Sequence, residues 1–154
     1  MQPSSPADAM GIDTPEERVL IALVRAAWVA SMASSAVVRR AGLTPSQYNV
    51  LRILRGAGSD GLSRNGIGER MVTRDPDLTR ILSGLARIRA VTTRRSSIDR
   101  RHRVSLITER GRSLLDRLDD DVRKAAIRSL SGLSPAQLKR LEELLGVVGE
   151  GADG

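Results

Sequence analysis

Residues 79–111 have the sequence TRILSGLARIRAVTTRRSSIDRRHRVSLITERG, and they hold the clearest signals of the fold in this chain. Its apolar residues first recur at helical spacing and then alternate in two short segments, 91–95 and 103–107, before Thr108-Glu109 begins a further helix. The segment from 87 to 103 holds seven arginines and one acidic residue. Positive charge gathered on a hairpin directly after a helix suits a polyanion, so the stretch predicts contact with DNA.

The composition of the 154-residue chain bounds the fold class. Apolar residues make up 40% and aromatic residues 1%, so the core must consist of Leu, Val, Ile and Ala, which suits packed helices better than packed sheets. The length allows one domain with a substantial core. All 25 basic residues lie between Arg18 and Arg140, whereas the charged residues of 1–17 and 142–154 are all acidic. We therefore predict a mainly α fold with a small β-hairpin and a basic central region.

The residue inventory argues against catalysis and metal binding. Without cysteine there is no disulfide, thiol redox centre or cysteine-ligated metal site, and His102 is the only histidine. A Ser–His triad would depend on His102, which lies in the basic hairpin. The glycines between Gly56 and Gly61 lack the Lys-Ser/Thr that completes a phosphate-binding loop. We therefore predict no enzymatic activity, no metal and no cofactor.

Capping residues divide the chain into helices. Residues 1–15 hold three prolines and are predicted to be a disordered arm, and 16–150 a single domain. Hydroxyl N-caps followed by proline mark three helix starts. The expected helices run from Thr14 to Arg40, from Thr44 to the break at Gly56–Gly61, over 64–72, from Asp75-Pro76-Asp77 to Ile88, from Thr108 to Ile127, and from Ser134 to Val148. Helical spacing predicts that Ile67 and Met71 face inward. The same spacing is followed by the apolar residues of the fourth helix and forms an apolar side on the last, and these residues are Leu78, Ile81, Leu82, Leu85 and Ile88, and Leu138, Leu141, Leu144, Leu145 and Val148.

The first helix is apolar nearly all round. Residues 19–38 carry one charge, Arg25, and are long enough to span a bilayer. Against a membrane span, the segment is rich in Ala and Ser, and a mid-span arginine costs about 2.5 kcal/mol or more on insertion scales. We instead expect this helix to be buried between subunits or deep in a domain. The start MQPSSPADAMGIDTPEE lacks a basic leader and an apolar run, so we expect a cytoplasmic, nucleoid-associated protein.

Residues 62–89 have the pattern of a helix-turn-helix, with two helices separated by a short turn at 72–74. In that motif the second helix enters the major groove with its N-terminal residues facing base edges. Arg80 is the candidate for reading a base, because its planar fork matches both acceptors of guanine; the alternative is that it contacts a phosphate or pairs with Asp77. The candidate DNA-contacting residues of this part are Arg64, Arg74, Asp77, Thr79, Arg80, Ser83 and Arg87.

The tip of the predicted hairpin, 96–101, is the second candidate DNA contact. Arginines at such a tip suit the narrow, electronegative minor groove. The alternative is a solvated charged loop, but its position directly after a helix-turn-helix favours DNA. The candidate contacts are Arg94, Arg95, Arg100 and Arg101.

The stretch from Leu43 to Gly111 resembles the winged helix-turn-helix of the MarR family of bacterial regulators. The resemblance is carried, without insertion or deletion, by Leu43-Thr44 with Gln47, Pro76-Asp77-Leu78-Thr79-Arg80, Asp99-Arg100-Arg101 and Ile107-Thr108-Glu109-Arg110-Gly111. It implies a winged helix-turn-helix over 43–107 and dimerisation helices at 16–41 and 108–150. It also implies a homodimer, expected to be a repressor, that binds a palindromic operator in double-stranded DNA. By the same resemblance, Arg101 would insert into the minor groove while Asp99 orients the wing.

One departure from the family pattern follows the recognition helix, where Arg89-Ala90-Val91 stands in place of Gly-Leu-Val. The missing glycine is the residue that most easily ends a helix with a positive φ. The missing leucine is a packing anchor beneath the wing. We expect a looser or differently angled wing, with altered DNA affinity or operator preference.

Many relatives respond to small phenolic or aromatic anions, which predicts an effector site here. The candidate lining residues are Trp28, Met32, Tyr48, Leu51 and Arg52. The alternative is that Trp28 and Tyr48 are ordinary core residues. Two other functions fit the same fold: a protein-interaction module, and a sequence-tolerant nucleic-acid-binding protein that uses charge alone.

Overall fold

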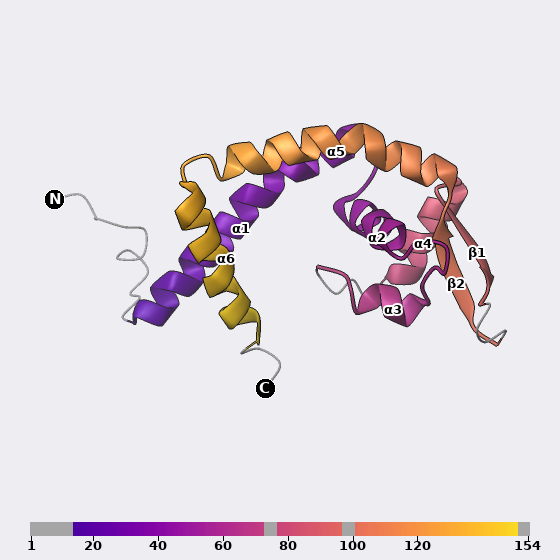
Figure 1. Ribbon diagram of the computed structural model, residues 1–154, viewed down its shortest axis with the longest axis horizontal. Helices are drawn as coiled ribbons and strands as arrows, with labels where there is room; N and C mark the ends of the chain where they lie inside the picture. The colour runs from indigo at the N-terminus through magenta and orange to yellow at the C-terminus, as the bar shows by residue number, and fades with distance from the viewer. Residues whose placement is uncertain (1–13, 73–76, 97–100, 151–154) are drawn as a thin grey trace. The chain divides into compact units, whose positions relative to one another are not determined.

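The computed structural model describes residues 14–72, 77–96 and 101–150 (Figure 1). The fold is mainly α with one two-stranded hairpin, as the composition predicted. Most of the predicted disordered arm lies outside the described residues. In chain order the elements are α1 (Pro15–Arg40), α2 (Pro45–Gly56), α3 (Arg64–Gly68), α4 (Leu78–Arg87), β1 (Val91–Arg95), β2 (Arg103–Ile107), α5 (Glu109–Ser129) and α6 (Pro135–Glu150).

The predicted N-caps are confirmed by their hydrogen bonds. The Thr44 hydroxyl accepts from the Gln47 backbone N–H at 3.1 Å, and the Gln47 side chain accepts from the Thr44 N–H at 2.9 Å. Ser134 and Gln137 make the same reciprocal pair at 3.3 and 2.9 Å. These capping boxes satisfy backbone donors that the first helical turn leaves unpaired.

The described residues form two compact units. Ser34–Lys124 is one unit, and the residues up to Ala33 together with those from Ala125 onward are the other. Helices α1 and α5 therefore each contribute to both units. Both units fall within the range predicted as a single domain.

The unit formed by Ser34–Lys124 has an aliphatic core, in line with the scarcity of aromatic residues. Figure 1 shows α2, α3 and α4 gathered together with the hairpin at their side. Helix α2 packs against α3, α4 and β2, and α4 packs against α3 and β1. The buried side chains of this unit include Val50, Leu51, Leu54, Ile67, Leu78, Ile81, Leu85, Ala90, Val91, Val104, Ile107, Leu115 and Leu118.

The hairpin has the strand bounds predicted from the sequence. Its antiparallel register runs from Val91 opposite Ile107 to Arg95 opposite Arg103. On its other edge, β2 exchanges two backbone hydrogen bonds between Ser105 and Leu62, at 2.8 and 3.0 Å. Gly61 has φ 69°, and a Cβ there would lie 2.6 Å from the Ser105 carbonyl oxygen, so only glycine fits this approach. The start of α3 is thereby held against β2.

Two helix predictions need correction. The segment predicted as a helix over 64–72 ends at Gly68, because Arg70 turns back to the Ile67 carbonyl in a tighter i to i−3 bond, and two glycines weaken the helix. Met71 is consequently half-buried rather than part of a helical inner face. Helix α4 ends at Arg87, and Ile88 is its exposed C-cap rather than an inner residue.

The other unit buries almost nothing. Of its residues that the structure describes, only Ala125 is buried. Trp28 is 64% exposed, so it is not a core residue of the chain. Helix α1 is long and apolar enough, by length and composition, to cross a membrane, with a mean hydropathy of 1.7. The apolar side predicted for α6 is likewise exposed, at Leu138, Leu141, Leu144, Leu145 and Val148.

Candidate nucleic-acid interface

Helix α4 separates its side chains into two faces. Leu78, Ile81 and Leu85 are buried in the core. Four predicted DNA-contacting residues are exposed on the same helix, and their spacing places them along its outer side. These residues are Thr79, Arg80, Ser83 and Arg87.

The first turn of α4 is fixed by Asp77. Its side chain accepts from the Arg80 backbone N–H at 3.2 Å, as the predicted N-cap. The Arg80 guanidinium lies 3.9 Å from the same carboxylate, but its side chain is 88% exposed. Exposed ion pairs of this kind contribute only about 0–1 kcal/mol, so the contact leaves the guanidinium able to exchange Asp77 for another acceptor.

Arg64 connects α3 to α4. Its guanidinium donates a hydrogen bond to the Thr79 hydroxyl at 3.0 Å. Two residues predicted separately from the sequence are thus brought together, at the point where the two helices of the predicted helix-turn-helix meet.

A cavity of about 500 Å³ is lined by residues from the start of α2 and from α4. The helices approach closely because Gly84 has no side chain: a Cβ there would lie 2.8 Å from the Gln47 amide nitrogen. Arg80 and Arg87 give this cavity a basic wall. Its lining residues are Thr44, Ser46, Gln47, Asp77, Arg80, Ile81, Gly84 and Arg87.

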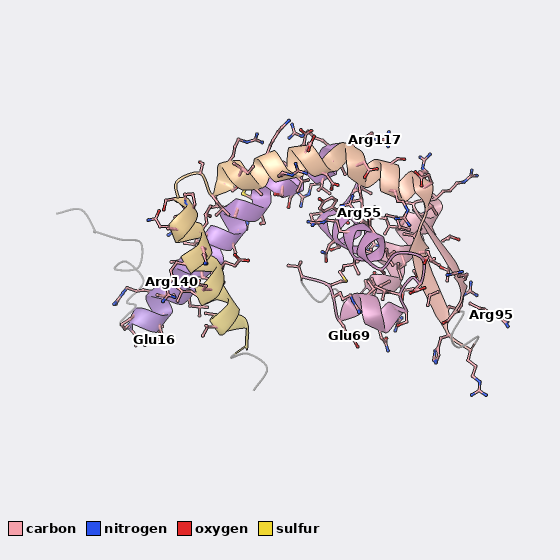
Figure 2. All side chains as sticks on the ribbon, viewed as in Figure 1. Glu16, Arg55, Glu69, Arg95, Arg117 and Arg140 are labelled. Carbon is pink, nitrogen blue, oxygen red and sulfur yellow. The ribbon has the colours of Figure 1, made fainter. Side chains whose placement is uncertain are left out.

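The arginines of the hairpin point to opposite faces. Arg94 stands opposite Val104 in the register, and its guanidinium donates to the Ser59 carbonyl at 2.6 Å. Arg95 stands opposite Arg103 on the other face, and Figure 2 shows its side chain projecting from the outer end of the hairpin. Arg94 would have to release Ser59 before it contacted DNA, whereas Arg95 already faces outward.

Of the arginines predicted to contact DNA within the tip, 96–101, the structure describes Arg101, which is exposed. The other predicted contacts, Arg74, Asp99 and Arg100, lie outside the described residues.

The departure at Arg89-Ala90 leaves the helix ending in a conformation that glycine favours. Arg89 has φ 59°, the one positive φ of a non-glycine residue in the described chain. Its N–H bonds to the Ala86 carbonyl, and the Ala90 N–H bonds to that of Leu85, both at 2.9 Å. These two bonds make a Schellman motif, in which the left-handed position is usually glycine. The expected glycine is therefore replaced without a change in how the helix ends.

The base of the hairpin is closed by contacts with the start of α5. The Thr108 hydroxyl donates to the Arg89 carbonyl at 2.7 Å and accepts from the Gly111 N–H at 3.1 Å. A Cβ on Gly111 would collide with the Ala90 carbonyl oxygen and approach the Ile107 side chain to 2.7 Å. Ala90 is itself buried, so this junction is tight although the leucine of the family pattern is missing.

Sequence reasoning missed an ion pair between α2 and α5. The Arg55 guanidinium makes two contacts with the Asp119 carboxylate, at 2.7 and 3.3 Å. The hydrogen bonds that Arg55 donates to the Asp119 carboxylate raise the pKa of Arg55, although partial burial opposes this. Asp119 belongs to a run of three acids in the sequence, and only the packing of α2 against α5 distinguishes it from its neighbours.

The predicted effector residues are divided between the two units. Trp28 and Met32 are exposed on α1 in one unit. Tyr48, Leu51 and Arg52 are in the other, where Leu51 is completely buried and the Arg52 guanidinium carbon lies 5.9 Å from the centre of the Tyr48 ring. The effector site stays a prediction.

No protein-family model and no curated protein matches the sequence. Solved structures, in contrast, match over most of its length. A MarR-family transcriptional regulator from Streptomyces coelicolor, solved in complex with DNA, is similar at a TM-score of 0.79 and 24% identity, with 91% of this chain and 93% of that chain covered. The chain has the MarR-family winged-helix fold. In this fold the β1–β2 hairpin is the wing.

Two further structures support the same MarR-type fold. A MarR-family protein from Mycobacterium tuberculosis in complex with DNA has a TM-score of 0.66 and 26% identity, covering 89% of this chain and 99% of that chain. BpsR from Bordetella bronchiseptica, whose DNA binding is regulated by 6-hydroxynicotinic acid, has a TM-score of 0.76 and 20% identity, covering 86% and 98%. The resemblance inferred from the sequence is confirmed for the MarR-type fold.

Proposed function

We propose that this protein is a homodimeric, sequence-specific DNA-binding regulator of transcription that represses genes near its palindromic operator. The observation that carries the proposal is the exposed polar side of α4, with Arg80, Ser83 and Arg87, next to a hairpin whose Arg95 faces outward. The same fold occurs in regulators solved on DNA.

In this proposal α4 enters the major groove and Arg80 reads a base there. Its weak pair with Asp77 costs little to break, and a bidentate contact with guanine contributes about 1–3 kcal/mol of discrimination between bases. The hairpin lies along the adjacent minor groove with Arg95 and Arg101. Contacts at both grooves give the protein an orientation on the duplex as well as sequence selectivity.

The homodimer is supported by the unit that lacks a core of its own. Exposed apolar side chains cover α1 and α6, whereas only Ala125 is buried among the described residues of that unit. Large apolar side chains exposed in such number on two helices support an interface, and the two-fold symmetry of a second copy would match a palindromic operator.

The proposal is tested by selecting duplexes that the protein binds and comparing them with random duplexes at physiological salt. We expect a selected palindrome that binds at least a thousandfold more tightly than random DNA. Equal binding to both duplexes would favour a sequence-tolerant nucleic-acid-binding protein, and binding to neither would favour a protein-interaction module.

The wing is tested by Arg101→Glu, with Arg117→Glu as the matched control on the exposed side of α5. Both variants change the net charge equally. We expect only Arg101→Glu to weaken binding by tenfold or more, since it places a carboxylate next to phosphates. Equal affinities for the two variants would remove Arg101 from the interface.

Regulation by a small aromatic anion belongs to the same proposal, because BpsR is regulated by 6-hydroxynicotinic acid. In this chain Trp28, Met32, Tyr48 and Arg52 are the candidate contacts. Release of a selected duplex on addition of 6-hydroxynicotinic acid would support the effector site, and unchanged binding would exclude this compound.

A further inference from the structure

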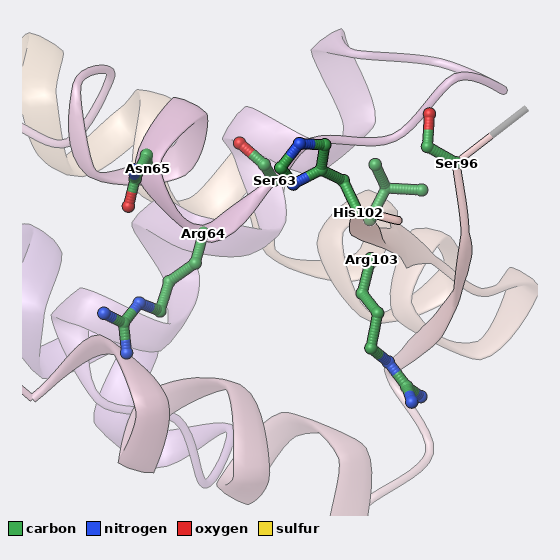
Figure 3. Close-up of a pocket in the computed structure, with 7 residues that line it drawn as sticks. Ser63, Arg64, Asn65, Ser96, His102 and Arg103 are labelled. Atoms are coloured by element: carbon green, nitrogen blue, oxygen red, sulfur yellow. The ribbon is translucent and has the colours of Figure 1, made fainter. Parts of the chain in front are cut away.

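A second cavity, of about 550 Å³, lies between the start of α3 and the outer end of the hairpin (Figure 3). No candidate DNA contact predicted from the sequence lies in it except Arg64. From the α3 side it is lined by Ser63, Arg64 and Asn65, and from the hairpin side by Ser96, His102, Arg103 and Val104.

The lining has the chemistry of an anion site. Two arginines, Arg64 and Arg103, border the cavity together with the only histidine of the sequence. Two hydroxyls and the Asn65 amide add neutral hydrogen-bonding groups, and no carboxylate is found among the described residues that line the cavity. Arginine forks match the oxygen geometry of phosphate groups.

The hairpin side carries charge at a cost to its own stability. Arg95 and Arg103 are directly opposite in the register, so their side chains leave the same face of the hairpin. Like charges in directly opposite positions destabilise a strand pair. An anion bound beside Arg103 would offset this repulsion, so it would stabilise the hairpin more than a neutral ligand would.

The two sides of the cavity are held at a fixed distance. The two backbone hydrogen bonds between Leu62 and Ser105 join the residue before the Ser63 cap to the strand that carries Arg103. Arg64 is in turn bonded to Thr79 at the start of α4. The Arg64 guanidinium and the backbone that carries Arg103 are therefore positioned before a ligand arrives, which lowers the entropic cost of binding.

We propose that this cavity binds a phosphodiester group of the DNA backbone, through Arg64 and Arg103 with Asn65 and His102 beside them. The inference rests on the proposed function. A duplex that offers its major groove to α4 and the adjacent minor groove to the hairpin must pass one sugar-phosphate strand between these two elements. The cavity lies between α3, which is bonded to the start of α4, and the hairpin, where that strand crosses.

The test measures how binding depends on salt, with the full chain and a random-sequence duplex. Each lost phosphate contact lowers the slope of log K against log salt by about 0.9. We expect Arg103→Gln to lower the slope by about that amount, and to weaken selected and random duplexes by the same factor because phosphate contacts carry no sequence information. Arg117→Gln removes the same charge from α5 and is expected to keep the wild-type slope.

A second variant distinguishes the loss of a phosphate contact from a folding defect in Arg103→Gln. Asn65→Asp keeps the size of the side chain and places a carboxylate in the cavity, so it is expected to weaken both duplexes at least as much as Arg103→Gln. If both cavity variants keep the slope of Arg117→Gln while the wild type binds a selected duplex, the phosphate site is refuted and the proposed function stands. If the wild type binds neither duplex, both are overturned.

Titration of the DNA-free protein with inorganic phosphate distinguishes a site for a DNA backbone phosphate from a site for a free phosphate ion. Phosphate that binds the wild type but not Arg103→Gln, together with unchanged DNA slopes, would assign the cavity to a free anion and overturn the DNA contact. Lowered DNA slopes support the backbone phosphate, whether or not free phosphate binds.

Discussion

Replacing Arg89 by glycine is expected to stabilise the protein. Arg89 holds φ 59° at the C-terminal end of α4, in the left-handed region where a Cβ crowds the following carbonyl. Its two neighbouring hydrogen bonds, to the Ala86 and Leu85 carbonyls, use only backbone atoms and survive the substitution. The change therefore removes strain without removing a contact that ends the helix.

The magnitude follows from two opposing effects. The left-handed conformation costs a non-glycine residue about 1–2 kcal/mol, which glycine avoids. The greater freedom of glycine in the unfolded chain costs about 0.4–1 kcal/mol. The free energy of unfolding should then rise by roughly 0.5–1 kcal/mol, which for a chain of this length raises Tm by about 1–4 °C.

Arg89→Ala is the matched control for this experiment. It removes the same exposed guanidinium but keeps a Cβ at the strained position, so it isolates the backbone effect from the loss of charge. Thermal and urea unfolding of the three proteins should be compared at one protein concentration, because the stability of a dimer depends on concentration. A glycine variant no more stable than the alanine variant would refute the strain argument.

Two further predictions concern the junction beneath the hairpin and the apolar helices. Gly111→Ala should destabilise the protein by about 1–3 kcal/mol in urea unfolding, because the new Cβ collides with the Ala90 carbonyl. The control is Gly56→Ala, where a Cβ meets nothing within 4 Å. Equal stabilities of the two variants would contradict the close contact at Gly111. Val24→Glu, at a position 60% exposed on α1, should convert the dimer to a monomer in analytical ultracentrifugation, whereas Val72→Glu, 85% exposed in the other unit, should not. A dimer that tolerates Val24→Glu would place the interface elsewhere.

The fold was predictable because its signals are local. Thr44 with Gln47 and Ser134 with Gln137 fix helix starts through side chains three residues apart, and the alternation in 91–95 and 103–107 fixes both strands. The short helix α3 was predicted too long because its end depends on two glycines and a tightened turn rather than on a capping signal.

The site was predictable only in part, because it depends on contacts between distant segments. The exposed side of α4 follows from helical spacing, but the bond from Arg94 to Ser59 joins the hairpin to a loop 35 positions away. The sequence marked Arg94 and Arg95 as equivalent arginines, and the strand register distinguishes them. The cavity between α3 and the hairpin likewise depends on the pairing of Leu62 with Ser105, which no sequence pattern predicts.

The apolar helices connect the stability of this protein to its DNA binding. A hydropathy of 1.7 makes α1 compatible with a bilayer by composition, but a bilayer would leave the exposed leucines of α6 unexplained. In the proposed homodimer, a second copy would cover both helices, with α1 and α6 contributing to one interface. Since such an interface would supply the core that the unit lacks, we expect the folding of α1 and α6 to depend on dimerisation. The same association doubles the number of α4 helices on a duplex, so a substitution that weakens the dimer should weaken DNA binding even where it leaves Arg80 and Arg103 untouched.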